Sequence, residues 1–540
     1  MTCKKIKTKI FLIGCVLGIS FLLLFSTNPG NSSSDLQVVC EIPVFMFNND
    51  SDQNTGEPDH SDKIIDGPND LLDLTPIIIR QIPGLSLPGK CYVSISASAR
   101  KYVQLFYKSG ENYVYIEKKE KQELPIDLLR DSDIELRIEA NSYACADWDG
   151  TVTVSALVED SGKTSSNSVR LKVAPFILLS AVQKALKIYV REFPGKNEKL
   201  IDALKELTPK IGVKLKIIGT DKYKPWNIWL QDVMEVGYSR TPFQVFHVVL
   251  NANRGKSLDA MPKQEILGPG HGWFKWDEFK PGTGAGRGGD SWLDWYGNLE
   301  VTPPLPGKPF GRILYGYNKH TGRSLNPQIV KMLEAQGVQT PLIKIHTGWL
   351  LIKHVDEIFN FIPVKGEKRF KILVPDVTIT YRLLEQWKAE GKGALTLFRD
   401  FKENVSVSSL LKNQSLRKFN THLQVNEIEA NIKTIKQETG VPDDHIIRIP
   451  ALFEKKYKYA ASLMPNMVNA AYMNGHILMA DPKGPVFDGE DLMQKYIFQL
   501  LNKEDVIVHF IDDLPYHKWH GNVHCATNVT YQPYDIAWWD

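Results

Sequence analysis

The pattern of apolar residues changes once along this chain of 540 residues, near residue 175. Before that point, short runs with much apolar alternation are separated by turn residues, for example 91–98, 133–140 and 150–159. Several short strands at such spacing predict an all-β sandwich. After it, helical stretches such as 198–212 alternate with strands such as 213–219, which predicts a mixed α/β domain.

Four segments follow from this change of pattern and from the N-terminal residues. They are a signal peptide or signal anchor (1–27), a polar linker (28–37), a β-sandwich domain (38–175) and an α/β domain (176–540).

The charge balance argues against nucleic acid as a partner. The chain has 65 Lys and Arg against 62 Asp and Glu, a net charge of +3, and no dense basic block. Hydrophobic residues make up 43% and charged residues 24%, which excludes a disordered chain. There is one long apolar run, so a multi-pass membrane protein is also excluded.

The N-terminus is typical of a secretory signal. Lysines in the first nine residues precede an apolar run over 10–25. This run is short for a membrane span, and no clear cleavage site follows it, so a cleaved signal and a signal anchor both stay open. Either predicts a secreted or membrane-anchored protein with an extracellular or lumenal catalytic domain. Five possible glycosylation sites are Asn31, Asn49, Asn404, Asn413 and Asn528.

A signal segment would also place the cysteines in an oxidising compartment, where disulfides form. Outside the signal the chain has Cys40, Cys91, Cys145 and Cys525. Cys91 and Cys145 both lie in strand-like sequence, and we expect these two to pair. All three pairings of four cysteines remain formally possible.

Chemically capable residues gather in four distant stretches, 227–238, 251–256, 348–363 and 516–529. If HVDE (354–357) is a strand, His354 and Asp356 point to the same face. Taken alone, each stretch has an ordinary interpretation. HVDE fits a surface strand with two polar residues, and a lone cysteine such as Cys525 is usually a small buried hydrophobe.

Two further features favour a reactive centre. On a strand His524 would face away from Cys525, so His354 from another segment is the better partner for the thiol. Asp232 follows Trp229 and Gln231, and a carboxylate near an indole can clamp a planar cation. Asp232 could equally be an exposed acid or a helix cap.

Together the blocks WLQDVMEVGY, YGNLEVTPP, GRILYGY, HVDEIFNF, PNMVN and HGNVHCATNV resemble the protein-arginine deiminases, in order along the α/β domain. The resemblance implies a five-bladed α/β propeller of the pentein type, preceded by an immunoglobulin-like sandwich. No internal sequence repeat is visible. It also implies conversion of peptidyl arginine to peptidyl citrulline and ammonia, so the expected partners are arginine-containing proteins. The oligomeric state stays open.

The resemblance assigns roles to single residues. Cys525 matches the nucleophile and His354 the general acid and base. Asp232 and Asp356 match the carboxylates that hold the guanidinium. Trp229 matches an aromatic wall beside the substrate stem. Arg254 matches the arginine that binds the substrate backbone.

Calcium (Ca²⁺) is the cofactor that the resemblance implies. One site of the family is complete in this sequence, and its ligands match Gln231, Glu235, Tyr296, Leu299 and Glu300. Tyr296 and Leu299 would bind through their backbone carbonyls. A second site lacks an acid at Val233 and retains only Asn253, so we expect it to be lost. The loop 48–62 is rich in Asp and Asn but misses the EF-hand spacing, so a calcium loop and a solvated polar loop both stay open.

Two departures from the family concern the pocket. Lys353 stands where the family tends to have glycine, and Trp519 replaces an arginine common near the pocket mouth. Both could change which arginines are accepted.

Three other functions remain as alternatives. A pentein acting on a free guanidino compound would not need Arg254 for a backbone contact. A non-catalytic binding protein would not need to retain the four reactive residues together. A cysteine protease would place its cysteine before its histidine and use an oxyanion hole.

Overall fold

The structure, a computed structural model, describes residues 35–86, 88–224, 227–276, 289–364, 369–401 and 404–539. The predicted signal segment 1–27 and the possible glycosylation site at Asn31 lie outside these residues. Within the described ranges, no helix has both the length and the apolar character needed to cross a membrane.

Two five-stranded sheets form the first part of the described chain. Their strand orders are β1-β3-β8-β5-β6 and β2-β10-β9-β4-β7. The strands are β1 (Val38–Val39), β2 (Val44–Phe45), β3 (Thr75–Ile79), β4 (Lys90–Ile95), β5 (Val103–Ser109), β6 (Asn112–Tyr115), β7 (Gln122–Leu124), β8 (Ile134–Ala140), β9 (Thr151–Asp160) and β10 (Lys163–Val173). Two short helices, α1 (Pro68–Asp73) and α2 (Ile126–Asp131), connect them.

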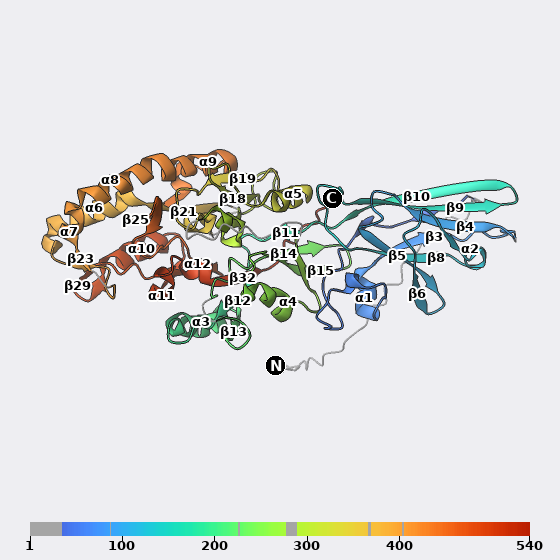
Figure 1. Cartoon of the computed structure of the whole chain (residues 1–540), viewed down its shortest axis with the longest axis horizontal. Helices are drawn as coiled ribbons and strands as arrows, with labels where there is room; N and C mark the ends of the chain where they lie inside the picture. Colours follow the sequence, from blue (N-terminus) through green and yellow to red (C-terminus); the bar gives the residue numbers. More distant parts are fainter. Residues whose placement is uncertain are drawn as a thin grey trace, which may run out of the picture. The chain divides into compact units, whose positions relative to one another are not determined.

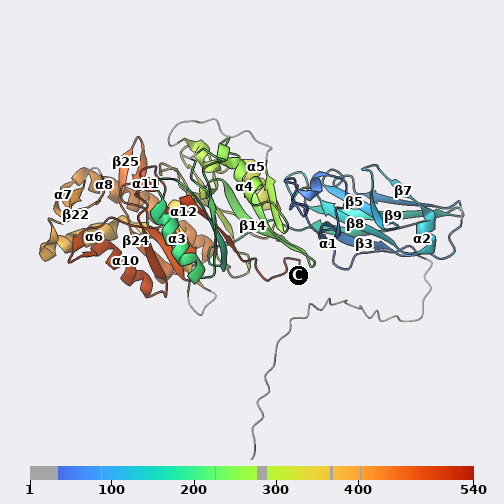
Figure 2. The ribbon, with the colours of Figure 1, turned by 90° about the horizontal axis from the view of Figure 1, so that it is seen from below.

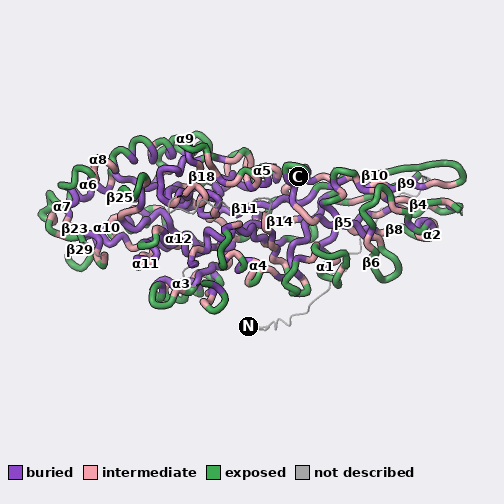
Figure 3. The backbone as a smooth tube through the Cα atoms, in the orientation of Figure 1, coloured by how far each residue is buried: buried purple, intermediate pink, exposed green. Residues whose placement is uncertain are grey.

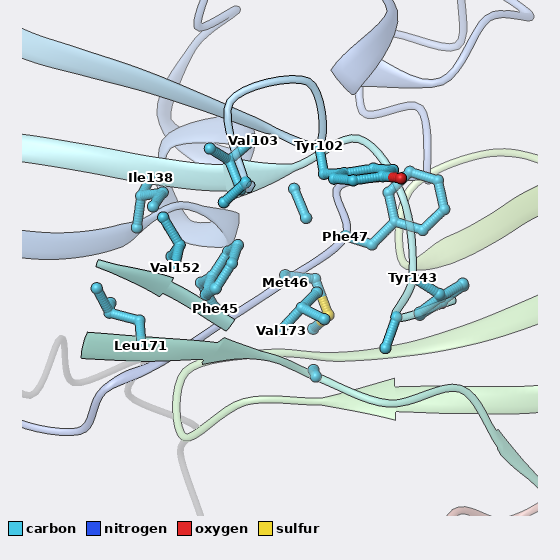
Figure 4. Packing of buried hydrophobic residues seen from close by; sticks show 14 of the residues in the cluster. Phe45, Met46, Phe47, Tyr102, Val103, Ile138, Tyr143, Val152, Leu171 and Val173 are labelled. Carbon is cyan, nitrogen blue, oxygen red and sulfur yellow. The ribbon is translucent and has the colours of Figure 1, made fainter. Parts of the chain in front are cut away.

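Alternation along the strands builds one core from both sheets. In β9 the residues Val152, Val154, Ala156 and Val158 are buried, and those between them are not, because successive side chains of a strand point to opposite faces. Figure 4 shows Val152 with Phe45 and Met46 in this core. The immunoglobulin-like type of the sandwich stays a prediction.

The predicted disulfide between Cys91 and Cys145 is wrong, because all four described cysteines are free. Cys91 lies inside β4, between β7 and β9. Cys145 lies in the turn after β8, where its Sγ faces the hydroxyl of Tyr102 at 3.9 Å. The strand-like sequence around both cysteines correctly indicated that they are buried. It did not indicate whether the two thiols lie close enough to pair.

Five sheets with one repeated topology form the α/β part. In each, a central strand has one antiparallel and one parallel neighbour. From antiparallel edge to parallel edge, the five sheets are β32 (Thr527–Tyr531), β12 (Ala185–Arg191) and β13 (Lys214–Ile218); β14 (Met234–Arg240), β15 (Val245–Asn251) and β16 (His271–Lys275), with β11 (Ile177–Leu178) added beside β14; β17 (Leu299–Val301), β18 (Ile313–Tyr317) and β19 (Ile343–His346); β20 (Asn360–Pro363), β21 (Phe370–Asp376) and β24 (Ile446–Pro450); and β27 (Ala471–Met473), β28 (His476–Ala480) and β31 (Ile507–Ile511).

Helices make the crossover from each central strand to its parallel neighbour, as parallel pairing requires. They are α3 (Glu198–Lys210), α4 (Met261–Glu265), α5 (Pro327–Ala335), the set α6 (Val377–Trp387), α7 (Val407–Lys412), α8 (Gln414–Leu423) and α9 (Glu429–Thr439), and α10 (Leu492–Asn502). Asp376 caps α6, because its Oδ1 accepts from the Ile379 amide at 2.7 Å. Figure 3 shows exposed residues along the outer turns of α8 and α9 and buried residues along the central strands.

The remaining elements are short. They include the hairpins β22–β23 (Thr396–Leu397, Val405–Ser406), β25–β26 (Phe453–Lys456, Tyr459–Ser462) and β29–β30 (Val486–Phe487, Glu490–Asp491), the helices α11 (Leu514–His517) and α12 (Val523–Ala526), and, among several short turns, η5 (Val355–Glu357, 3₁₀) and η7 (Gln424–Ile428, π).

One sheet joins the two ends of the α/β part. β32, near the C-terminus, pairs antiparallel with β12, so that Val529 lies opposite Ile188. Figures 1 and 2 place the red C-terminal α12 among green and orange elements from much earlier in the chain. The short helix α12 is therefore fixed next to β32 and within reach of segments hundreds of residues away.

Candidate active site

A pocket of ≈ 510 Å³ receives side chains from all four stretches singled out in the sequence. Its lining includes Trp229, Asp232, Arg254, His354, Trp519 and Cys525. Asp356 lies directly beneath it, because its Oδ2 is 3.3 Å from the Sγ of Cys525. The fold thus brings together every residue predicted to take part in the reaction.

One asparagine contacts both the backbone and the side chain of Cys525. Its backbone amide donates to Oδ1 of Asn469 at 3.1 Å, and Nδ2 of Asn469 donates to its Sγ at 3.2 Å. The pKa of the thiol is raised well above its usual value by burial and then by the nearby carboxylate of Asp356. Asn469 was part of the PNMVN block, but nothing in the sequence indicated this contact.

The local conformation around Cys525 differs from the prediction. Cys525 lies in α12, not in a strand, and its neighbour His524 reaches the same carboxylate. Nδ1 of His524 donates to Oδ2 of Asp356 at 2.9 Å, and its Nε2 lies 3.5 Å from Oε1 of Glu300. Burial opposes charge on this imidazole, but the hydrogen bond to Asp356 and the charge of Glu300 outweigh it, so the pKa of His524 is raised.

HVDE is also not a strand. His354 precedes the 3₁₀ turn η5, whose residue Glu357 accepts a hydrogen bond from the His354 amide at 3.2 Å. The imidazole is fully buried, with Nε2 2.9 Å from the carbonyl oxygen of Trp292. Its Nδ1 lies 3.5 Å from Oδ1 of Asp232. In this structure His354 therefore faces Asp232, whereas Asp356 faces the thiol.

Asp232 is surrounded by groups that favour its charged form. Nη2 of Arg254 lies 3.8 Å from its Oδ2, and His354 faces its other oxygen. Burial nevertheless raises the pKa of Asp232, and the charges of His354 and Arg254 only partly oppose the shift. The guanidinium of Arg254 is stacked over the Trp295 ring at 4.6 Å. Its side chain is only 1% exposed, so it lies deeper than a residue at a pocket mouth.

The indole of Trp229 forms one wall of the pocket. A Cβ on Gly521 would lie 2.4 Å from this ring, so the turn after α11 can approach Trp229 only because residue 521 is glycine. Trp519, 46% exposed, lies on the same turn and lines the pocket. Lys353 does not line it. The lysine is buried at φ 71°, with its Nζ 3.8 Å from the centre of the Tyr459 ring.

Three of the five residues predicted to bind calcium meet beside His524. A cavity of ≈ 30 Å³ is lined by Gln231, Glu235 and Glu300, together with His524 and Asn528. Burial and mutual repulsion raise the pKa of Glu235 well above its usual value, and burial raises the pKa of Glu300 to about 7. Two half-buried carboxylates around one small cavity fit a hard cation. Of the two residues predicted to bind through backbone carbonyls, Tyr296 has its carbonyl oxygen 3.5 Å from Nε2 of Gln231, and Leu299 is buried in β17.

The sandwich carries a second group of acids, of which Asp50 and Asp73 are buried and Asp52 is half-buried. One oxygen each of Asp50, Asp52 and Asp73 lies within 4.8 Å of the others, and each has a buried carboxylate oxygen without a hydrogen-bond partner in the described structure. Burial raises the pKa of Asp50 to about 8 and that of Asp73 to about 10. Residues 48–51 are buried, so this part of the loop is not a solvated surface segment.

Two possible glycosylation sites are inaccessible. Asn528 is buried, and its Nδ2 donates to Oε1 of Gln231 and to the carbonyl of Met234. Asn49 is buried, and its Nδ2 donates to the hydroxyl of Tyr143. Asn404 and Asn413 are exposed.

A buried thiol beside an imidazole and two carboxylates is an arrangement found in cysteine-dependent enzymes. The family model of protein-arginine deiminase (PAD) matches residues 163–540. Human protein-arginine deiminase type-1 is 30% identical over 526 residues, covering 92% of this chain and 77% of the human protein. Human type-3 is 30% identical over 524 residues, with the same coverage of both chains. The chain belongs to the protein-arginine deiminase family.

A solved structure offers a more distant likeness. An agmatine deiminase from C. jejuni matches 66% of this chain and 96% of its own, at 11% identity and a TM-score of 0.40.

The prediction of a secreted or membrane-anchored protein is wrong. The chain matches human protein-arginine deiminase type-1 over nearly its whole length, and this relationship carries no sign of secretion or of an anchor. The prediction rested on an apolar run in 1–27, and a short apolar run after lysines is a compositional signal that other kinds of segment share. The membrane tether is likewise not retained.

Proposed function

We propose that this protein hydrolyses the guanidinium group of peptidyl arginine to give peptidyl citrulline and ammonia. The observation that carries the proposal is the meeting of Cys525, Asp356, Asp232 and His354 around one pocket in a member of this family. Two acids beside one pocket suit a delocalised cation better than an acyl group.

In this mechanism Asp232 and Asp356 bind the guanidinium nitrogens and orient the central carbon toward the Sγ of Cys525. The thiolate attacks that carbon and forms a C–S bond. The C–N bond to one terminal nitrogen then breaks, and this nitrogen leaves as ammonia after taking a proton from His354. Water adds to the same carbon, His354 accepts its proton, and the C–S bond breaks to release citrulline and the thiolate.

The electrostatics of the site favour ionisation of the thiol once substrate is bound. In the free protein, burial and the charge of Asp356 hold the pKa of Cys525 high. A guanidinium between the carboxylates adds a positive charge close to Sγ and neutralises these acids. Substrate binding therefore lowers the pKa of the nucleophile that will attack it.

Arg254 and Trp229 bind the part of the substrate outside the guanidinium. Trp229 supplies a flat apolar wall for the aliphatic stem. Nε of Arg254 is buried and has no hydrogen-bond partner within the described residues. When the guanidinium turns toward the pocket on substrate binding, this donor reaches a carbonyl oxygen of the substrate backbone, which favours peptidyl over free arginine.

Calcium is the cofactor of the proposed enzyme. Gln231, Glu235 and Glu300 would hold one ion through side-chain oxygens, with the carbonyls of Tyr296 and Leu299. The bound ion would neutralise the two half-buried carboxylates next to His524 and so fix the segment that carries Cys525. Asp50, Asp52 and Asp73 would hold calcium in the sandwich, which favours the calcium-loop interpretation of 48–62.

The pentein-type propeller is the arrangement we propose for the five repeated sheets. The pairing of β32 with β12 supports it, because a ring of blades needs one sheet built from both chain ends. That need also explains why Cys525, near the C-terminus, would face residues near position 230.

The test compares wild-type protein with Cys525→Ala on an arginine-containing peptide and on free arginine, with calcium and with chelator. Mass spectrometry follows the replacement of an imino group by oxygen, and ammonia release is measured in parallel. We expect conversion of the peptide alone, dependent on calcium and abolished in the variant. Conversion of free arginine alone would favour a small-molecule deiminase. No conversion by folded, reduced, calcium-loaded protein would contradict the enzyme proposal.

A further inference from the structure

Three side chains that the proposed reaction does not use meet at the β19 end of the β17–β18–β19 sheet. They are His320, His346 and Glu427, and one nitrogen or oxygen of each lies within 4.8 Å of the others. His346 and Glu427 are buried, whereas His320 is exposed. Two imidazoles and one carboxylate form a ligand set typical of zinc sites.

The fold positions these residues from three separate elements. His346 ends β19, opposite Tyr317 of the parallel strand β18, and His320 follows in the turn after β18. Glu427 lies in the π-helical turn η7, an irregularity that often marks functional sites. Asn431, one turn later, accepts from the His346 amide at 3.2 Å and donates to its carbonyl at 2.9 Å.

The imidazole of His346 is the observation that points to a ligand. Its side chain is 8% exposed, and its Nε2 is buried without a hydrogen-bond partner in the described structure. The Nε2 atom lies 3.4 Å from Oε2 of Glu427. Nδ1 lies 3.1 Å from the Tyr317 carbonyl. Nδ1 also faces the backbone amide of Lys319 at 3.2 Å, from which it accepts in the other tautomer. Metal binding needs the proton on Nδ1, donated to the Tyr317 carbonyl, because this leaves a lone pair on Nε2 directed at the carboxylate. A backbone carbonyl is a common partner of a metal-binding histidine.

We propose that His346, Glu427 and His320 bind one zinc ion or a similar divalent transition metal. Two atoms bound tetrahedrally at about 2.1 Å from zinc lie roughly 3.4 Å apart, which matches the Nε2 to Oε2 distance. His320, on an exposed turn, supplies the third ligand and water the fourth. Calcium prefers oxygen donors and is excluded by the two imidazoles.

Lys319 is the group that competes with the metal. Its Nζ lies 3.1 and 2.8 Å from the two oxygens of Glu427 and provides the counter-charge in the metal-free protein. This ion pair satisfies the Glu427 carboxylate, whereas Nε2 of His346 has no hydrogen bond among the described residues. The lysine side chain is 40% exposed, so it can move into solvent when a cation binds.

The site would connect a metal to the segment that carries His354. Nε1 of Trp349 donates to the His346 carbonyl at 3.0 Å, and His354 follows five residues later. An ion between β19 and η7 would therefore anchor the start of this segment to the α8–α9 helices. This role is separate from the proposed deimination, so the metal site can be tested without activity.

The experiment titrates full-length protein with zinc against a chromophoric chelator. Excess calcium occupies sites built from oxygen ligands, and Cys525→Ser removes the reactive thiol in every variant. In this background we expect one tight zinc site. His346→Gln and His320→Gln should weaken it by about 100-fold and 10-fold, since a ligand is lost in each. His422→Gln, at an exposed histidine near the end of α8, is the matched control and should change nothing.

Lys319→Met separates a metal site from a simple ion pair. If the lysine competes with zinc for Glu427, its removal should tighten zinc binding by several-fold, and zinc should raise the melting temperature of this variant. Circular dichroism verifies that each variant is folded, and His320→Gln, on the surface, keeps the test valid if His346→Gln does not fold. Equal zinc affinity in the parent and in both histidine variants would overturn the proposal. So would unchanged or weaker binding by Lys319→Met.

Discussion

At the scale of single residues, the carboxylate of Asp356 has two opposing effects on Cys525. It is needed to hold the guanidinium, yet at 3.3 Å from Sγ it raises the pKa of the thiol in the free protein, after the larger effect of burial. We predict that Asp356→Asn abolishes turnover and at the same time increases alkylation of Cys525 by iodoacetamide several-fold at pH 8. The alkylation rate, followed by mass spectrometry, checks this.

The matched control is Asp221→Asn, which removes one negative charge from an exposed loop. Neither turnover nor alkylation should change in it. Slower alkylation in Asp356→Asn would mean that the carboxylate promotes ionisation of the thiol, contrary to the electrostatics proposed for the free site.

At the scale of elements, the approach of the turn before β17 to the site depends on one glycine. A Cβ on Gly297 would lie 2.4 Å from Nδ1 of His354 and 3.0 Å from Oδ1 of Asp232. We predict that Gly297→Ala lowers kcat/KM at least about 100-fold by displacing the imidazole, with the fold retained. Gly268→Ala is the control, because its methyl group meets only the Asn54 side chain, at 3.2 Å. Wild-type kinetics in Gly297→Ala would show that this contact does not position His354.

The sequence predicts the residues around the pocket, but it does not predict the local structure of all the segments that carry them. The residues around the pocket could be predicted because ordered blocks carried them, and α3 could be predicted from its apolar period. Two features could not be predicted from the sequence, because tertiary contacts decide both. They are the 3₁₀ turn at Val355–Glu357 and the contact of His524 with Asp356. The five sheets repeat a topology without repeating residues, so no sequence repeat revealed them.

At the scale of the whole molecule, the acids of the sandwich tie its stability to the α/β part. Oδ2 of Asp50 accepts from the amide of Gly270, just before β16, at 2.7 Å, and the carbonyl of Asn49 accepts from the Trp273 amide at 2.8 Å. Tyr143 meets Ser239 through their hydroxyls at 2.7 Å. The acidic loop is therefore part of the contact between sandwich and α/β part, and its protonation or its binding of cations should affect unfolding of both.

Burial raises the folded-state pKa of Asp50 to about 8 and that of Asp59 to about 7, from an ordinary value near 3.8. At a pH between the ordinary value and these raised values, the folded protein keeps protons on Asp50 and Asp59 that the unfolded chain has released. The free energy of unfolding therefore falls as pH rises through this window. With chelator present, we predict a melting temperature that decreases steadily from pH 5 to pH 8. Calcium should restore several degrees at pH 8 and much less at pH 5, where protons occupy the same carboxylates. Asp50→Asn should flatten both dependences, and a melting temperature in chelator that rises with pH would show that these acids are ionised in the folded protein.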